Sequence, residues 1–76
     1  MKTNLNIVKG YRVMLGFNQS QMAKELGISK QSYYAKESGN VHFTDDEKAK
    51  FKGLVVAIFP NITIDDIFFA RFTKKY

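Results

Sequence analysis

Three adjacent polar side chains carry the kinds of group that form hydrogen bonds with nucleic-acid bases. Lys30 carries an ammonium group, Gln31 a side-chain amide and Ser32 a hydroxyl. These groups donate hydrogen bonds to, or accept them from, the base edges exposed in the major groove of DNA. At about 100° per residue along an α-helix, Gln31 and Ser32 point away from Tyr33, so one face can pack while the other reads. The stretch therefore predicts a helix with a packing face and a polar face, and the polar face could contact bases if this helix enters the major groove.

The residues before this helix have the spacing of two short helices joined by a tight turn. Ala23 lies four positions before Gly27, and Tyr33 lies six positions after it. A small side chain lets two helices approach closely, and a glycine accepts the positive φ that the turn needs. This spacing predicts a helix-turn-helix. Its other apolar positions are occupied by Met22, Leu26 and Ile28.

Capping residues and breakers divide the whole chain into five predicted helices, an all-α fold without repeats or linkers. Asn18 with Gln21, and Thr44 with Glu47, have the spacing of capping boxes, and Gly or Pro closes most segments. The first helix is expected to start after Asn4. The predicted helices span residues 5–16, 19–26, 30–38, 45–59 and 64–69.

Length and composition limit the classes of protein that this chain can represent. It has 76 residues, 45% of them apolar and none of them cysteine. We expect one small domain at residues 1–69 with a basic, aromatic tail at 70–76. Disulfides and thiolate metal sites are excluded. No apolar run resembles a signal peptide or a membrane span of about 20 residues, which predicts a cytoplasmic protein without membrane contact.

Residues suited to catalysis are scarce. The chain has one histidine, His42, and no glycine-rich phosphate loop or histidine pair at metal-ligand spacing. The paired acids Asp45-Asp46 and Asp65-Asp66 both open predicted helices, where the helix dipole favours carboxylates. We therefore expect no enzyme activity, no catalytic residue, no metal, no cofactor and no small-molecule ligand.

The net charge of +5 is unevenly distributed along the chain. Residues 1–43 carry +4, residues 44–69 carry −2, and residues 70–76 carry +3. A basic surface of this kind favours a polyanionic partner and one binding face over an even coat of charge.

Further short motifs lie around the predicted helix-turn-helix. They are Arg12 in the first helix, Phe17-Asn18-Gln19 before the second, Glu37-Ser38-Gly39 after the third, and Ile64-Asp65-Asp66-Ile67-Phe68 near the end. With the turn, these motifs resemble the phage Cro/repressor-type helix-turn-helix family from about residue 5 to residue 69. The resemblance implies a compact five-helix, lambda-repressor-like domain whose third helix enters the major groove.

The resemblance also implies roles for individual residues. The expected base-reading positions are Lys30, Gln31 and Ala35, flanked by Ser32 and Tyr34. The expected phosphate contacts are Asn18, Gln19, Ser29 and Asn40, although Asn18 and Ser29 also fit simple helix caps. Arg12 and Glu37 are expected to form a structural salt bridge beneath the motif.

Two residues depart from the pattern of that family. A branched aliphatic residue is usual at Tyr33, and a large apolar one is usual at Lys36. We expect the Tyr33 ring in the core with its hydroxyl at the edge, and the Lys36 stem buried with its ammonium hydrated.

A single domain of this type usually binds DNA as a dimer on a palindromic site. We expect a Cro-like repressor that forms a homodimer, either in solution or only on DNA, through Phe68, Phe69 and Phe72. An activator or an autoregulating antitoxin would use the same motif, and the sequence does not separate them. The alternative from another class is a protein-interaction adaptor that docks partners through the aromatic C-terminal segment.

Overall fold

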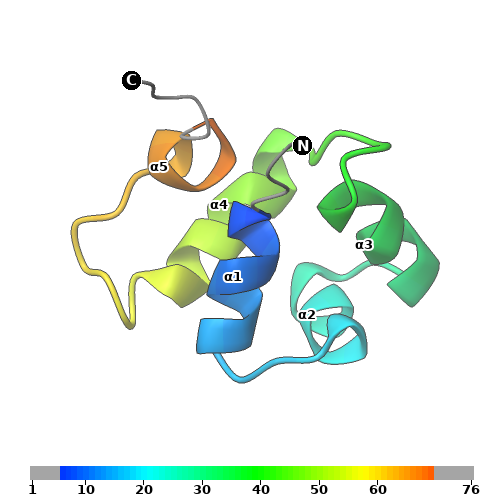
Figure 1. Cartoon of the computed structure of the whole chain (residues 1–76), viewed down its shortest axis with the longest axis horizontal. Coiled ribbons are helices and arrows are strands. Elements are labelled where there is room, and N and C mark those ends of the chain that lie inside the picture. The colour runs from blue at the N-terminus through cyan, green and yellow to red at the C-terminus, as the bar shows by residue number, and fades with distance from the viewer. Residues whose placement is uncertain (1–5, 70–76) are drawn as a thin grey trace, which may run out of the picture.

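The computed structural model of the chain describes residues 6–69, and every regular element in that range is an α-helix. In Figure 1, α2 and α3 lie together at one end of the molecule, α5 lies towards the other, and α1 and α4 lie between them. For the described residues, the prediction of an all-α chain with five helices is confirmed. The helices are α1 (Ile7–Met14), α2 (Gln19–Leu26), α3 (Lys30–Glu37), α4 (Asp45–Val55) and α5 (Ile64–Phe68).

Helix starts within this range follow the capping residues of the sequence. In α2, the Asn18 side chain accepts from the backbone N–H of Gln21, whose side chain accepts from the N–H of Asn18. Such a box satisfies backbone donors that the first turn of a helix leaves free. Boxes of the same kind begin α4 at Thr44 and α5 at Thr63, and the Ser29 hydroxyl caps α3.

The turn between α2 and α3 depends on Gly27, whose φ of 76° lies in the left-handed region. The backbone N–H of Gly27 donates to the carbonyl of Lys24 at 3.1 Å, and that of Ile28 donates to the carbonyl of Ala23 at 3.0 Å. Glycine adopts this conformation without a Cβ clash, which ends α2 and lets α3 begin at Lys30.

The first helix starts later than the sequence predicted. Its N-cap is Asn6, whose side-chain oxygen accepts from the backbone N–H of Lys9 at 2.9 Å. The same side chain donates to the backbone carbonyl of Glu37 at 3.0 Å. Asn6 thus both starts α1 and ties it to the end of α3.

The fourth helix ends earlier than predicted. Ile58 N–H donates to the carbonyl of Val55 at 2.9 Å, a three-residue spacing that tightens the chain after the helix. Pro60 disfavours a helical conformation at the residue before it. Ile58 and Phe59, expected on the buried stripe, are consequently 39% and 41% exposed.

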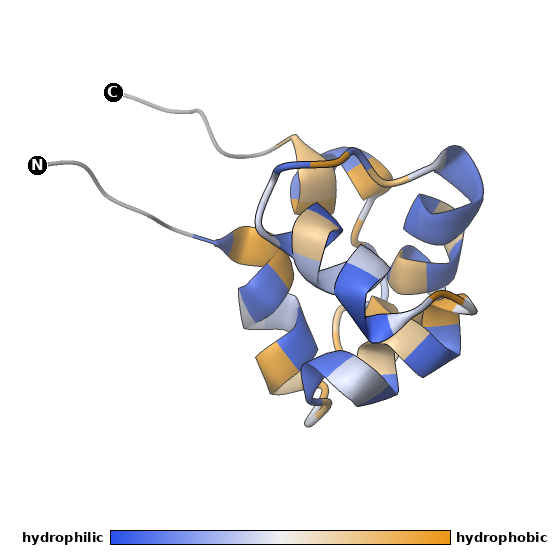
Figure 2. Cartoon of the chain, turned by 90° about the vertical axis from the view of Figure 1, so that its right-hand side faces the viewer, coloured by the Kyte–Doolittle hydropathy of each residue, from blue (hydrophilic) through white to orange (hydrophobic). Residues whose placement is uncertain are grey.

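The core forms where the apolar stripes of these helices meet. Hydrophilic and hydrophobic residues follow one another along each helix (Figure 2), as amphipathic helices require. Ala23 is a buried residue of α2. The rings of Phe43 and Phe51 lie edge to face, with 6.3 Å between their centroids. The buried apolar residues are Met22, Ala23, Leu26, Tyr33, Phe43, Phe51, Val55 and Ile67.

Candidate nucleic-acid interface

The two faces of α3 differ as the sequence predicted. Tyr33 and Glu37 are buried, whereas Gln31 and Ala35, at about 100° per residue, point away from both. Lys30, Gln31, Ser32 and Tyr34 are exposed, and Tyr34 keeps 57% of its surface accessible. Ala35, the fifth predicted reader, is half-buried. The exposed face thus presents an ammonium, an amide and two hydroxyl groups to solvent.

The residues predicted to hold phosphate lie at helix ends. The side-chain oxygen of Asn18 accepts from Gln21 N–H at 2.8 Å, and that of Ser29 accepts from Ser32 N–H at 3.0 Å. Both therefore cap their helices, which was the simpler of the two roles considered. Asn40 is exposed in the turn after α3, and its N–H donates to the carbonyl of Ala35 at 2.9 Å.

Gln19 makes a contact that the sequence analysis did not predict. Its side-chain Nε2 donates to Oε1 of Glu37 at 2.9 Å, and the residue is half-buried. This bond joins the first residue of α2 to the last residue of α3. A role in positioning α3 is therefore added to the phosphate contact expected of Gln19.

The predicted salt bridge between Arg12 and Glu37 is present. Arg12 Nε lies 2.7 Å from Glu37 Oε2, and Nη2 donates to Oε1 at 3.3 Å. The remaining guanidinium nitrogen, Nη1, donates to the carbonyl of Phe17 at 2.8 Å. The side chains are 9% and 4% exposed, so α1, the α1–α2 connection and α3 meet at a nearly buried ion pair.

The hydroxyl of Tyr33 is not at the edge of the core, which corrects the sequence expectation. The residue is fully buried, and its hydroxyl donates to Glu37 Oε2 at 2.7 Å. Burial and then this hydrogen bond raise the pKa of the phenol well above its usual range. The signal in the sequence was the spacing of four between Tyr33 and Glu37, which brings their side chains to one face of the helix.

The ammonium of Lys36 is not hydrated, which corrects a second expectation. Its Nζ donates to Oε1 and Oε2 of Glu47 at 2.6 and 2.7 Å, and the side chains are 11% and 9% exposed. Glu47 also accepts from the N–H of Thr44 at 2.9 Å within its capping box. This ion pair connects α3 with the first turn of α4.

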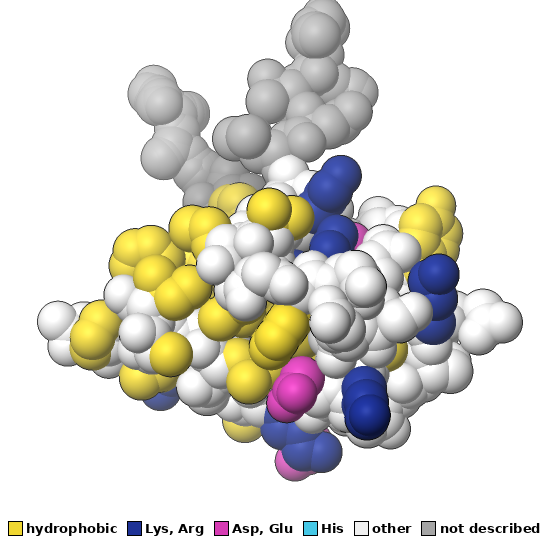
Figure 3. All heavy atoms as spheres, turned by 90° about the horizontal axis from the view of Figure 1, so that it is seen from below, with side chains coloured by type: hydrophobic (Ala, Val, Ile, Leu, Met, Phe, Trp, Pro, Cys, Tyr) yellow, Lys and Arg dark blue, Asp and Glu magenta, His cyan; other side chains and the backbone are white. Residues whose placement is uncertain are grey.

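The surface beside the exposed face of α3 is polar. A hollow between α1, the start of α2 and α3 is lined on its outer part by Lys9, Asn18, Ser20, Lys30 and Tyr34. Seen from below (Figure 3), Lys and Arg side chains lie mainly over the centre and the α2–α3 end, whereas hydrophobic side chains gather toward the α4–α5 connection. The two ends of the molecule thus differ in chemistry.

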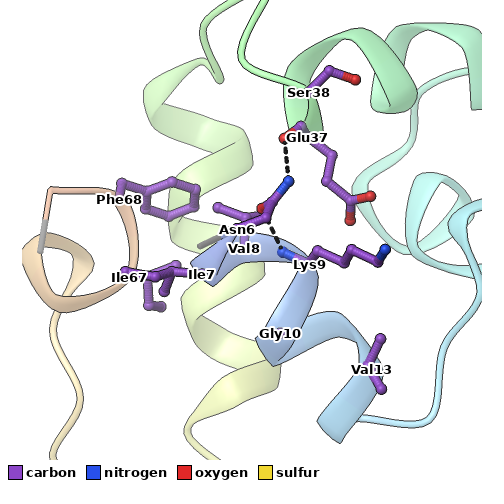
Figure 4. A pocket seen from close by; sticks show the side chains of 10 residues that line it. All are labelled: Asn6, Ile7, Val8, Lys9, Gly10, Val13, Glu37, Ser38, Ile67 and Phe68. Atoms are coloured by element: carbon purple, nitrogen blue, oxygen red, sulfur yellow. Dashed lines mark hydrogen bonds between the residues drawn. The ribbon is translucent and has the colours of Figure 1, made fainter. Parts of the chain in front are cut away.

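A second hollow lies between α1, the end of α3 and α5 (Figure 4). Asn6 bridges it with the two hydrogen bonds already described, which Figure 4 draws as dashed lines. Its apolar side is formed by Val8, Ile67 and Phe68. This hollow lies beside the C-terminal end of α3.

The aromatic residues predicted for a dimer interface have different environments. Phe68 is half-buried, and its ring lies 5.2 Å from that of Phe43 and 5.6 Å from that of Phe51. It is therefore mainly part of the core, whereas Phe69 is 50% exposed, with the Lys48 ammonium 4.8 Å from its ring centroid. Phe72 lies outside the described residues.

Other kinds of site are not evident between residues 6 and 69. That part of the chain contains no group of three His, Cys, Asp or Glu residues placed to hold a metal ion. Within the same range, each helix is too short or too polar to cross a lipid bilayer.

The buried carboxylates predict how stability depends on pH. Burial alone would raise the pKa of Glu37 and of Glu47, but hydrogen bonds from Arg12, Gln19 and Tyr33 to the first, and from Lys36 and Thr44 to the second, outweigh it. Both pKa values therefore lie below the usual range. A depressed carboxylate pKa stabilises the fold above the unfolded pKa of about 4.3, and this contribution is lost as pH falls through the folded pKa.

We expect the urea midpoint to be level near neutral pH and to fall below about pH 4.5. Glu47→Gln keeps a residue that can complete the capping box but removes the titrating group, so its midpoint should fall less steeply. Glu25→Gln, which alters an exposed carboxylate, should follow the unmodified chain. Identical acid profiles for all three proteins would contradict the assignment.

No protein-family model, curated protein or solved structure matches this chain. Its function is therefore inferred from its own residues and their geometry.

Proposed function

We propose that the chain is a sequence-specific, double-stranded DNA-binding transcriptional regulator with a Cro/repressor-type helix-turn-helix in a lambda-repressor-like fold. α2 and α3 are the two helices of the motif, and α3 enters the major groove. The observation that carries the proposal is the exposed surface of α3, where Lys30, Gln31, Ser32 and Tyr34 are accessible while Tyr33 and Glu37 are buried. An α-helix with such a face fits the width of the major groove.

Each reading residue has a preferred chemical partner among the base edges. The Lys30 ammonium suits the O6 and N7 acceptors of guanine, and the Gln31 amide can pair with N6 and N7 of adenine. Ala35 can contact a thymine methyl group with the part of its side chain that remains accessible. Ser32 and Tyr34 can add hydroxyl contacts on either side.

Phosphate contacts would fix the orientation of α3 on the duplex. Asn18 and Ser29 lie at the starts of α2 and α3, where free backbone N–H groups and the helix dipole attract anions. Lys9 and Lys30 add positive charge beside the hollow between α1, the start of α2 and α3. Asn40 extends the contact surface past the end of α3.

We propose that two copies bind one palindromic site. Two-fold symmetry places the two recognition helices about 34 Å apart on successive major grooves. Phe69, which is 50% exposed directly after α5, is the described member of the expected dimer contacts that remains exposed. Repression, activation and autoregulation as an antitoxin all remain compatible with this mode of binding.

Exposed apolar side chains favour a second candidate, a protein-interaction adaptor or an antitoxin that docks a partner protein. Val13 and Met14 on α1, with Ile58 and Phe59 after α4, are 39–58% exposed. An adaptor of this kind would bury these side chains against its partner and would not need the polar face of α3.

Binding of random DNA at several salt concentrations separates the two candidates. A helix-turn-helix regulator should bind random DNA at low salt and lose that affinity steeply as salt rises. The reason is that protein binding releases cations from the phosphates, and added salt opposes this release. An adaptor should show little binding at any salt concentration. Absence of binding at 50 mM salt would therefore contradict the proposed function.

Gln31→Ala tests the reading face directly. On a selected cognate site we expect a loss of about 1–3 kcal/mol in binding free energy and relaxed preference at one base pair. Affinity for random DNA should be unchanged, because the substitution removes no charge. Lys24→Ala, on α2, is the control and should at most weaken binding to the cognate site and to random DNA equally. If Gln31→Ala also lost equal affinity for the two kinds of DNA, the assignment of Gln31 would be overturned.

A further inference from the structure

The last two residues of α3 carry opposite charges and bind partners on two different helices. Glu37 accepts from Arg12 of α1 at 2.7 Å, and Lys36 donates to Glu47 of α4 at 2.6 Å. All four side chains are nearly buried, with 4–11% of their surface exposed. The C-terminal half of α3 is thus bonded to two neighbouring helices, α1 and α4.

Apolar packing anchors this helix through one side chain. Among the described residues, α3 supplies a single buried apolar side chain, Tyr33, whereas α2 supplies Met22, Ala23 and Leu26. Even Tyr33 donates its hydroxyl to Glu37. One apolar anchor leaves the orientation of α3 to be completed by the hydrogen bonds and ion pairs of Lys36 and Glu37.

The Lys36–Glu47 pair has a geometry that restricts sliding and rotation. The ammonium reaches both oxygens of the carboxylate, at 2.6 and 2.7 Å. The carboxylate cannot follow a moving lysine, because Oε1 also accepts from Thr44 N–H and the Glu47 N–H donates back to the Thr44 hydroxyl. Charge-assisted hydrogen bonds depend on direction, whereas an apolar contact at the same place would tolerate small shifts.

We propose that Lys36 is a positioning residue whose ion pair with Glu47 sets the orientation of α3 and thereby the DNA sequence preference. Lys36 itself faces α4 and reads no base. Its loss lets the exposed face of α3 rotate relative to α2, so that Lys30 and Gln31 no longer meet their base edges together. This inference rests on the proposed function, and its test includes a measurement made without DNA.

The DNA test compares Lys36→Met with Lys50→Met. Each removes one positive charge, but Lys50 is about half exposed and lies 3.3 Å from an exposed Asp46 carboxylate. We expect both variants to bind random DNA alike, whereas Lys36→Met loses about tenfold or more of its preference for a selected site, the loss expected from one misplaced base contact. Full retention of that preference by Lys36→Met overturns the proposal.

A double variant keeps the test valid if the single substitution leaves Glu47 uncompensated and the chain unfolds. Lys36→Met with Glu47→Gln removes the ion pair and keeps a side chain that can complete the capping box at Thr44. We expect a folded protein by circular dichroism with the same loss of preference. A folded double variant that reads the selected site as well as the unmodified chain also overturns the proposal.

Amide hydrogen exchange in the free protein gives the readout without DNA. Lys36→Met, or the double variant, should speed exchange of the α3 amides about tenfold relative to those of α2, and Lys50→Met should not. Unchanged α3 exchange refutes the positioning role. If the unmodified chain shows no DNA preference while α3 exchange responds as expected, the proposed function fails and the positioning of α3 by Lys36 stands.

Discussion

Replacing Arg12 with methionine is expected to lower the free energy of unfolding by about 3–5 kcal/mol, because the substitution leaves a buried charge without its partner. The Glu37 carboxylate is 4% exposed and would keep only the hydrogen bonds from Gln19 and Tyr33. The carbonyl of Phe17 would also lose its donor. A domain of this length is typically stable by about 4–11 kcal/mol, so a chain near the lower end of that range would be largely unfolded at 37 °C.

Urea unfolding at pH 7, followed by circular dichroism, measures this loss. Lys50→Met removes one charge from an exposed pair and should change the free energy of unfolding by less than about 1 kcal/mol. Arg12→Met with Glu37→Met removes both buried charges and should recover part of the stability. A loss for Arg12→Met no larger than that for Lys50→Met would show that the pair does not support the fold.

Phe51→Ala is the second substitution expected to have a large effect, with a loss of about 3–5 kcal/mol. Phe51 is fully buried in α4, and its ring contacts those of Phe43 and Phe68. Removing it leaves a cavity between α4 and α5 that the remaining rings can fill only in part. The thermal midpoint should fall accordingly.

Phe69→Ala is the matched control, because it deletes the same ring from a residue that is 50% exposed. Its cost in the monomer should stay below about 1 kcal/mol, since little buried area is lost. Equal destabilisation by the two substitutions would contradict the placement of the core. If Phe69 lies in a dimer interface, Phe69→Ala should weaken association while leaving monomer stability nearly unchanged.

Local sequence signals predicted the starts of α2, α3 and α4 well. Asn18, Ser29 and Thr44 each place a side-chain oxygen within reach of a free N–H, an interaction that depends on a few neighbouring residues. Gly27 ends α2 for a reason that is equally local, its positive φ. The division of α3 into buried and exposed positions follows from helical periodicity, so the exposure of the proposed base-reading residues could also be predicted.

Contacts between distant residues were harder to predict. The bond from Lys36 to Glu47 spans a turn whose path no local signal fixes. Without knowledge of that path, we expected the Lys36 ammonium to lie in solvent. The bond from Gln19 to Glu37 likewise depends on how α2 and α3 cross. The early end of α4 was missed because apolar spacing continued to Phe59, although Pro60 was visible.

The aromatic residues near the C-terminal end illustrate the same limit. Phe68 and Phe69 are adjacent in the sequence, yet one packs into the core and the other is half exposed. Only the orientation of α5 on α4 decides which ring points inward. Composition alone suggested one shared interface for both.

Selection of bound fragments from a random pool of double-stranded DNA tests the central claim, that α3 reads base sequence, most directly. The account predicts enrichment of one short motif present as inverted half-sites about 10 base pairs apart, centre to centre. Selection with Gln31→Ala should relax one position of that motif and leave the spacing unchanged. A pool that stays random through selection, while the protein is folded and binds DNA only through charge, would contradict the claim.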